Sequence, residues 1–115
     1  MRVLIVDDEK LARDRLRELL NDIGGYTVVG DAMNGAEAVE KSAELNPDVL
    51  LMDIRMPGMD GLEAAMHLMG MENPPSVIFT TAYDQHALDA FDVNAVDYLL
   101  KPIRKDRLAK ALSKA

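Results

Sequence analysis

The stretch Val3-Leu4-Ile5-Val6-Asp7-Asp8 joins a short apolar run directly to two adjacent acids. The stretch Val49-Leu50-Leu51-Met52-Asp53 has the same design, with a single acid at its end. Continuous apolar runs of this length are typical of parallel strands buried on both faces of a sheet. If the two runs are neighbouring parallel strands, Asp7, Asp8 and Asp53 converge at one edge. The two stretches therefore predict a parallel sheet with an acidic edge.

Apolar runs of strand length alternate with stretches of helical period along the whole chain. This alternation predicts an α/β fold in which helices cover both faces of a parallel sheet. We expect a flavodoxin-like (βα)5 three-layer sandwich with right-handed crossovers and the strand order 2-1-3-4-5. In that order the first and third strands are neighbours, at the point where ligands bind such sheets. The predicted strands lie near residues 3–6, 27–30, 49–52, 77–80 and 96–99.

Apolar residues at helical spacing predict five helices, each with a buried stripe. The dipeptide Asn34-Gly35 is a start signal for the second helix, and the fourth helix, around residues 85–91, is short. The predicted stripes are Leu16, Leu19, Leu20 and Ile23 in the first helix; Ala36, Val39 and Ala43 in the second; Leu62, Ala65, Met66 and Met69 in the third; and Leu108, Ala111 and Leu112 in the fifth.

Composition limits what the chain can do. Its 115 residues suit a single domain, residues 1–115, with a real core. The formal net charge of -7 opposes nucleic-acid binding by this segment itself, because phosphate backbones are held by clustered lysines and arginines. The absence of cysteine excludes disulfides, thiolate catalysis and zinc–thiolate sites. No apolar stretch approaches the ~20 residues of a membrane span, so we expect a soluble, cytoplasmic chain without a membrane partner.

The acidic cluster needs a counter-charge. Asp8 has an alternative role as a helix N-cap, but Asp53 precedes what reads as a loop, residues 54–58, so its carboxylate is free for another task. Each close pair of carboxylates costs on the order of 1–4 kcal/mol. Mg²⁺ offsets this cost best, because it prefers a few hard oxygen ligands and keeps open positions for phosphate oxygens. We therefore expect Mg²⁺, with Mn²⁺ as a substitute.

Two further strand ends would contribute polar groups to the same edge. Thr81 offers a hydroxyl and Lys101 an ammonium group, both suited to phosphoryl oxygens. Asp53 is then the candidate nucleophile, because a carboxylate can attack a phosphoryl group and form an acyl phosphate. Taken singly, Thr81 is more often a strand-end residue that satisfies backbone groups, and Lys101 is more often a solvated lysine before a proline. The acids, Thr81 and Lys101 together lie at the predicted ends of the first, third, fourth and fifth strands, and this joint placement favours the phosphoryl site.

Other chemistries find less support. His67 and His86 lie in no metal-ligand pattern and are expected to be exposed helix residues. A haloacid-dehalogenase-like phosphatase is a rival, but such enzymes need a second acid two residues after the nucleophile, where this chain has Arg55. A flavodoxin-like cofactor binder is a second rival, disfavoured because an acidic edge repels phosphates unless a cation intervenes.

Over its full length the chain resembles the receiver domains of two-component response regulators. The residues that carry the resemblance are Val-Asp7-Asp8-Glu, Asp53-Ile-Arg-Met-Pro-Gly-Met-Asp-Gly61, Thr81-Ala82 and Tyr98-Leu-Leu-Lys101-Pro102. The sequence of residues 81–91 and 95–102 is most similar to that of the LytTR-type subgroup, of which AlgR is an example.

This resemblance implies roles for single residues. Asp53 would accept a phosphoryl group from a sensor histidine kinase or from a small donor such as acetyl phosphate. Asp8, Asp53 and the backbone carbonyl of Arg55 would ligate Mg²⁺, and Asp7 would act through a water. Thr81 and Tyr98 match the switch pair, while Arg55 and Tyr83 occupy positions that tune the lifetime of the phosphate. The family also has a cis peptide bond at Lys101-Pro102.

The resemblance also implies partners. Phosphorylation would switch the face formed by the fourth helix, fifth strand and fifth helix, which would dock an output domain or a second copy in a homodimer. Asp97 with Arg104 or Arg107 would form polar pairs across that dimer, or would remain solvated surface charges. LytTR-type regulators bind DNA through a C-terminal domain that this chain lacks; the alternative is a stand-alone receiver. The expected activity is signalling, with self-phosphorylation from small donors and autodephosphorylation only.

Overall fold

The computed structural model describes residues 1–82 and 95–115. The predicted helix at 85–91 and the predicted site residue Tyr83 lie outside the described residues. Within them no helix is long and apolar enough to cross a membrane. The described elements are β1 (Arg2–Val6), α1 (Lys10–Ile23), β2 (Thr27–Ala32), α2 (Gly35–Leu45), β3 (Val49–Asp53), α3 (Gly61–Met69), β4 (Ser76–Thr81), β5 (Asp97–Leu100) and α4 (Lys105–Ser113).

The five strands form one parallel sheet in the order β2-β1-β3-β4-β5, which confirms the predicted topology. In the register, Val6 lies opposite Met52, and Asp53 lies opposite Thr80. The carboxyl ends of β1, β3 and β4 therefore meet along one edge. The strand order reverses between β1 and β3, where the sequence predicts the ligand site.

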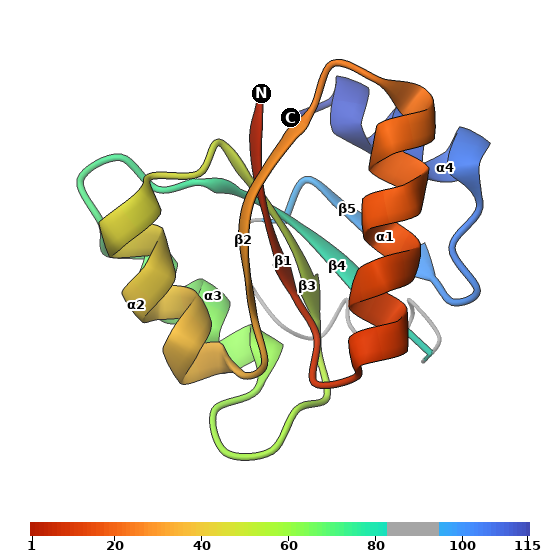
Figure 1. Cartoon of the computed structure of the whole chain (residues 1–115). Helices are drawn as coiled ribbons and strands as arrows, with labels where there is room; N and C mark the ends of the chain where they lie inside the picture. The colour runs from red at the N-terminus through yellow and green to blue at the C-terminus, as the bar shows by residue number, and fades with distance from the viewer. Residues whose placement is uncertain (83–94) are drawn as a thin grey trace.

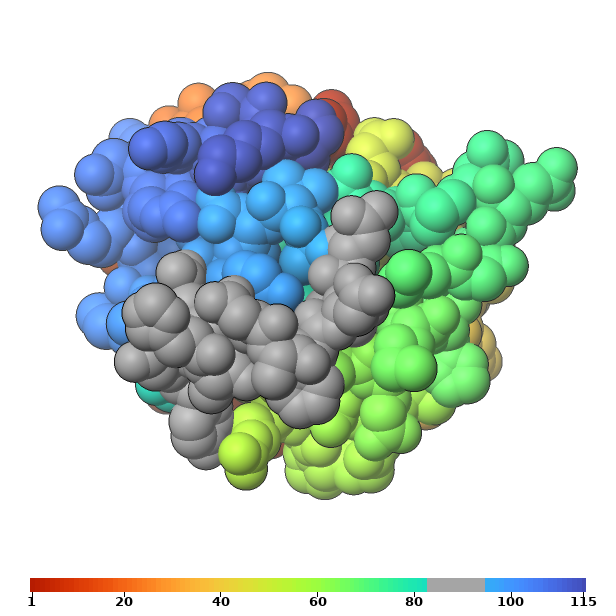
Figure 2. All heavy atoms as spheres, turned by 180° about the vertical axis from the view of Figure 1, so that it is seen from behind, coloured from red at the N-terminus to blue at the C-terminus, as the bar shows by residue number. Residues whose placement is uncertain are grey.

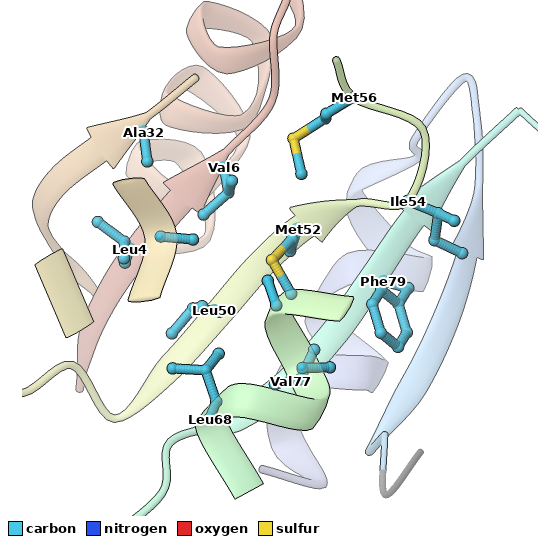
Figure 3. Packing of buried hydrophobic residues seen from close by; sticks show 13 residues of the cluster. Leu4, Val6, Ala32, Leu50, Met52, Ile54, Met56, Leu68, Val77 and Phe79 are labelled. Carbon is cyan, nitrogen blue, oxygen red and sulfur yellow. The ribbon is translucent and has the colours of Figure 1, made fainter. Parts of the chain in front are cut away.

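Helices α1 and α4 cover one face of the sheet, and α2 and α3 cover the other (Figure 1). Successive side chains of a strand point to opposite faces, so an unbroken apolar run feeds two cores at once. Figure 3 shows this for the α2/α3 side, where Leu4, Leu50, Met52 and Phe79 gather from three strands. Their sequence neighbours, such as Ile5 and Ile78, belong to the core under α1 and α4.

The predicted buried stripes are right for α1 and α4, wrong for α2 except for the partly buried Val39, and only partly right for α3, where the predicted Ala65 is buried. Leu16, Leu19 and Leu20 are buried in α1, as are Leu108, Ala111 and Leu112 in α4. In α2 and α3, however, the buried residues are mostly small ones: Gly35, Ala38 and Ser42 in the first, and Gly61, Ala64, Ala65 and Leu68 in the second.

The difference has a steric cause. Helices α2 and α3 lie against the loop after β3 so closely that a Cβ on Gly35 would come within 2.5 Å of the Met59 carbonyl oxygen. Large side chains do not fit such an approach, so Met66 and Met69 point outward and are 64% and 51% exposed. A prediction that weights residues by apolar size therefore wrongly places Met66 and Met69 on the buried face of α3.

Side chains cap the N-termini of α2 and α3 but not those of α1 and α4. Asn34 begins α2 by accepting a hydrogen bond from the backbone N–H of Glu37 at 2.9 Å, which confirms the predicted start signal. Asp60 caps α3 in the same way. At α1 the N-cap position is Glu9, with no side-chain cap, so Asp8 is not the N-cap. The carboxylate of Asp8 is therefore not engaged in the alternative role that the sequence suggested for it.

Candidate functional site

Three acids from two strand ends converge at the carboxyl edge of the sheet. Asp7 and Asp8 follow β1 and Asp53 ends β3, and one carboxylate oxygen of each lies within 4.8 Å of the others. Asp7 is wholly buried, Asp53 is 7% exposed and Asp8 is exposed. The convergence predicted from the two apolar runs is therefore confirmed.

Lys101 supplies the cation nearest to this cluster among the described residues. Its Nζ donates to Asp7 Oδ2 at 2.9 Å and to Asp53 Oδ2 at 3.4 Å. The lysine follows β5, and its peptide bond to Pro102 is cis, as the resemblance implied. The interpretation of Lys101 as a merely solvated lysine is wrong, because its side chain is only 26% exposed and joins two acids.

The period of the strands explains why these three side chains meet. Val3 and Ile5 face the α1/α4 core, and Asp7 is the next residue in that series. Asp53 continues Val49 and Leu51 in the same way, and Lys101 continues Leu99. All three side chains therefore lean toward the side of the sheet that α1 and α4 cover. This count by two, made along each strand, places Asp7, Asp53 and Lys101 on the same side of the sheet from sequence alone.

Hydrogen bonds hold both carboxylate oxygens and the backbone carbonyl of Asp7. Its Oδ1 accepts from the Glu9 backbone N–H at 2.9 Å, and its backbone carbonyl accepts from Arg13 at 2.7 Å. Arg13 also lies 3.5 Å from Asp31. Sequence reasoning missed Arg13; its signal is a cation one turn into the helix that follows the two acids. With both carboxylate oxygens engaged, Asp7 is a rigid part of the site.

The loop after β3 folds back against the end of that strand and positions Asp53. Its Oδ1 accepts from the Ile54 N–H at 2.8 Å, and the Gly61 N–H donates to the Ile54 carbonyl at 2.8 Å. A Cβ on Gly61 would lie 2.2 Å from the backbone oxygen of Asp53, so only glycine fits there. The sequence analysis used this glycine only as part of the stretch that carries the family resemblance and missed its role in packing.

Burial and the neighbouring charges both shift the pKa values of the site. Burial, the largest effect, raises the pKa of the Asp53 carboxyl; the Lys101 charge opposes this rise and the Asp7 charge adds to it. Burial alone would lower the pKa of Lys101, but its hydrogen bond to Asp7 and the charge of Asp53 outweigh it, and the net pKa is raised. A second cation near Asp53 would therefore favour its ionised form.

The other predicted site residues have distinct places. Thr81 ends β4 and is wholly buried. The half-buried ring of Tyr98 on β5 stacks on Phe79, with centroids 5.5 Å apart and planes 20° from parallel. Arg55 is exposed in the loop after Asp53. Thr81 thus ends a strand at the carboxyl edge of the sheet, and Arg55 follows Asp53 by two residues. Tyr98 packs against the core.

Asp97 is engaged within the chain. Its carboxylate accepts two hydrogen bonds of 2.8 Å from Arg107 and one of 3.0 Å from Lys114. These bonds hold its pKa well below the ordinary carboxyl range, with the Arg107 hydrogen bonds as the largest cause. The side chain is only 10% exposed, so the expectation of a solvated surface charge is wrong. Arg107 is one of the two expected partners, but it binds Asp97 within the chain; a pair across a dimer stays a prediction. The ion pair ties α4 to β5, whose blue surfaces adjoin in Figure 2.

The acidic edge fits a small divalent cation. Among the described residues, Lys101 is the cation that pairs with these carboxylates, and Arg13 binds the backbone carbonyl of Asp7, so three carboxylates still outnumber these two cations. Carboxylate oxygens are the donors that Mg²⁺ prefers, and it needs only one or two of them. Asp8 is exposed and thus accessible to an ion. The donor set therefore matches the cation that the sequence predicts.

Comparisons with known proteins agree with this geometry. Residues 3–113 match the family model of the response regulator receiver domain. The chain is 55% identical over 116 residues to the positive alginate biosynthesis regulatory protein of Pseudomonas aeruginosa, covering 100% of this chain and 47% of that protein. It is 43% identical to the sensory transduction protein LytT of Bacillus cereus, covering 99% of this chain and 46% of that protein. The chain thus spans about half the length of these curated relatives.

Solved structures lead to the same family. The response regulatory domain of mrkE from Klebsiella pneumoniae has a TM-score of 0.87 and 33% identity, covering 99% of this chain and 93% of that chain. The signal receiver domain of the putative response regulator NarL from Mycobacterium tuberculosis has a TM-score of 0.89 and 37% identity, covering 97% and 92%. The chain belongs to the response regulator receiver domain family, and its relatives place it near the LytT-like and alginate regulators.

Proposed function

We propose that this chain is a phosphorylatable switch in which Asp53 accepts a phosphoryl group from a sensor histidine kinase. The observation that carries the proposal is the meeting of Asp7, Asp8 and Asp53 within 4.8 Å, with Lys101 joining two of them. Such a site can hold the charges of a phosphoryl group and transfer it, because phosphoryl transfer depends mainly on positioning and neutralised charge.

Asp53 is the best nucleophile among the three acids. Asp7 is wholly buried and both of its carboxylate oxygens accept hydrogen bonds. Asp8 is exposed, without the buried surroundings that orient Asp53. In Asp53, Oδ1 is held by the Ile54 N–H, while the longer 3.4 Å contact to Lys101 leaves Oδ2 less strongly engaged.

In the reaction, an Asp53 carboxylate oxygen forms a bond to phosphorus as the bond from phosphorus to the donor breaks. The electron pair of that bond leaves with the donor, as an imidazole nitrogen of the kinase histidine or as acetate from acetyl phosphate. Lys101 stabilises one phosphoryl oxygen, and the Thr81 hydroxyl donates to another. The product is an acyl phosphate.

Receiver domains bind Mg²⁺ at an acidic pocket, and the proposed ligands in this chain are Asp8, Asp53 and the Arg55 carbonyl, with Asp7 acting through a water. When bound, the cation supplies positive charge to the phosphoryl oxygens. Mn²⁺ would serve as a substitute. The excess of carboxylate over ammonium charge at this edge supports the proposal.

Phosphorylation would act on the rest of the molecule through differential contacts. We assign Thr81 and Tyr98 as the switch pair, and Arg55 and Tyr83 as the residues that tune the lifetime of the phosphate. The face that responds includes β5 and α4, which Asp97 and its partners tie together. A homodimer through this face is part of the proposal.

The wider protein is inferred from relatives of twice the length. Residues 1–115 form the receiver domain, and a transcriptional output would come from a DNA-binding domain beyond them, as the name of the alginate regulator suggests. The net charge of -7 supports the proposal that the further domain, and not this segment, binds DNA. A stand-alone receiver that acts by docking is the alternative. Either form would work in the cytoplasm.

Intact mass spectrometry tests the proposal. The chain is incubated with acetyl phosphate in Mg²⁺ and, separately, in EDTA. We expect one adduct with the mass of a single HPO₃ group, formed in Mg²⁺ and greatly reduced in EDTA. Asp53→Asn should abolish the adduct, whereas Asp22→Asn, the same change at an exposed site on α1, should leave it intact.

Absence of an adduct on the unaltered chain would refute the proposal. Persistence of the adduct in Asp53→Asn would assign the chemistry to another residue. Repeated hydrolysis of a small phosphate ester would revive the phosphatase alternative.

A further inference from the structure

The carboxylate of Asp8, a proposed Mg²⁺ ligand, is exposed and has no hydrogen bond or ion pair of its own among the described residues. Its position therefore depends on the backbone of the short turn that leads from the end of β1 into α1 (Figure 1). Mg²⁺ demands near-ideal octahedral geometry, so a ligand that is free to move binds it poorly. Whatever holds this backbone also sets the position of the ligand.

One side chain holds the peptide bond between Asp7 and Asp8. Arg13 donates from Nη1 to the carbonyl oxygen of that bond, which belongs to Asp7, at 2.7 Å. Side chains on a helix lean toward its N-terminus, so Arg13, near the start of α1, reaches back to the end of β1. The contact fixes the plane of the peptide bond, and with it the direction in which the Asp8 side chain leaves the backbone.

An ion pair with Asp31 is the alternative role for Arg13. The Nε atom of Arg13 lies 3.5 Å from Asp31 Oδ2. Arg17, however, already donates to the same oxygen at 3.2 Å. The two arginines also differ in exposure, since the Arg13 side chain is 12% exposed and that of Arg17 is 43% exposed. Asp31 therefore does not need Arg13 for its charge, and the hydrogen bond to the Asp7 carbonyl is the contact that sets Arg13 apart.

We propose that Arg13 is a positioning residue for the Mg²⁺ site, which holds the Asp7–Asp8 peptide bond so that the Asp8 carboxylate is placed for the cation beside Asp53. The inference rests on the proposed function, because it takes Asp8 and Asp53 as ligands. Asp31, on β2, holds the guanidinium from its other side, since the flat group can use separate nitrogens for the two contacts.

Positioning and charge predict opposite effects when Arg13 is replaced. A guanidinium beside a divalent cation repels it, so removal of the charge alone would tighten Mg²⁺ binding. Loss of the hydrogen bond to the Asp7 carbonyl would release the peptide bond and weaken Mg²⁺ binding. The sign of the change in affinity therefore separates the two roles.

Mg²⁺ is titrated into the ¹⁵N-labelled 115-residue chain without phosphoryl donor, and binding is followed by two-dimensional NMR. Arg13→Met should weaken Mg²⁺ about tenfold, at the lower end of the range for groups that orient metal ligands. Arg17→Met is the matched control, because it removes the same charge from the same helix and the same partner, Asp31. It should change the affinity by less than about twofold. Before Mg²⁺ is added, the order parameter of the Asp8 N–H should fall in Arg13→Met only.

Arg13→Lys provides for the case in which the methionine variant does not fold. It keeps the charge, but one ammonium group cannot replace two separate guanidinium nitrogens, so we expect about threefold weaker Mg²⁺ binding. Equal or tighter binding in Arg13→Met would overturn the positioning role, as would equal binding in Arg13→Lys if only that variant folds. No Mg²⁺ binding by the unaltered chain would overturn the proposed metal site, and this inference with it.

Phosphorylation by acetyl phosphate gives a second readout. The Mg²⁺ concentration for half of the maximal rate should rise about tenfold in Arg13→Met, whereas the rate at saturating Mg²⁺ should change by less than about twofold. An unchanged half-saturating concentration would overturn the positioning role. Mg²⁺ binding without any phosphorylation of the unaltered chain would overturn the proposed acceptor chemistry, while the NMR titration would still decide the role of Arg13.

Discussion

Replacing Lys101 with methionine removes the positive charge at the acidic edge while keeping the length and apolar stem of the side chain. The ammonium lies 2.9 Å from an oxygen of Asp7, whose side chain is wholly buried, and 3.4 Å from one of Asp53. At an effective dielectric constant of 20, each contact corresponds to ~5 kcal/mol of attraction, part of which is offset by the desolvation of Lys101. Breaking a buried ion pair from one side typically costs 3–5 kcal/mol.

Because Lys101 retains 26% of its exposure, we expect the lower end of that range, about 3 kcal/mol of unfolding free energy at pH 7 in EDTA. Mg²⁺ should restore about half of the loss, since it brings positive charge to the same carboxylates and binds only the folded chain. The assay is urea denaturation followed by far-UV circular dichroism, with the slope against urea checked for constancy.

Lys10→Met is the matched control, because Lys10 is 77% exposed and, among the residues that the structure describes, pairs only with Asp14 on the same helix. This change should leave the unfolding free energy nearly unchanged, with and without Mg²⁺. A loss of less than about 1 kcal/mol in Lys101→Met, or an equal effect of Mg²⁺ on both variants, would refute the reasoning. The acids would then not be held together by this lysine.

Three further predictions concern stability. Asp53→Asn should raise the melting temperature in EDTA at pH 7: the raised pKa of Asp53 means that folding disfavours its ionised form, so the gain should shrink as the pH falls and Asp53 takes up a proton. Asp97→Asn should cost about 2 kcal/mol at pH 7 by urea denaturation, through its bonds to Arg107. Because the folded pKa of Asp97 is depressed, that difference should narrow as the pH falls below about 3.9. Ser42→Ala should stabilise the chain by about 1 kcal/mol, since the buried Ser42 hydroxyl has no partner in residues 1–82 and 95–115; a loss of stability would contradict this.

Continuous apolar runs made the sheet predictable. Because Val3–Val6 and Val49–Met52 alternate between two cores, they had to be strands buried on both faces, and the acids after them had to meet. The packing of α2 and α3 was not predictable from apolar size. Their close approach at Gly35 and Gly61 depends on distances between segments far apart in sequence.

The polar pairings, too, were only partly predictable from sequence. A cation was predicted at the edge because Lys101 follows the last strand, but its choice of Asp7 as the nearer partner depends on how the two strand ends lean. Arg107 was named as a partner of Asp97, but across a dimer; that the two pair within one chain was not predicted, because their ten-residue separation has no helical or strand period. Only the docking of α4 on β5 brings the two together. Pairings set by strand register were therefore accessible from sequence, and pairings set by helix docking were not.

The central claim is that the carboxylate of Asp53, rather than that of Asp7 or Asp8, receives the phosphoryl group. Borohydride reduces an acyl phosphate to an alcohol, so treating the acetyl phosphate-labelled chain converts the acceptor aspartate to homoserine. Peptide sequencing by tandem mass spectrometry then identifies the position. The account predicts homoserine at residue 53 and at neither neighbour in the cluster. Homoserine at residue 7 or 8, or its absence in a chain that carries the adduct, would contradict the account.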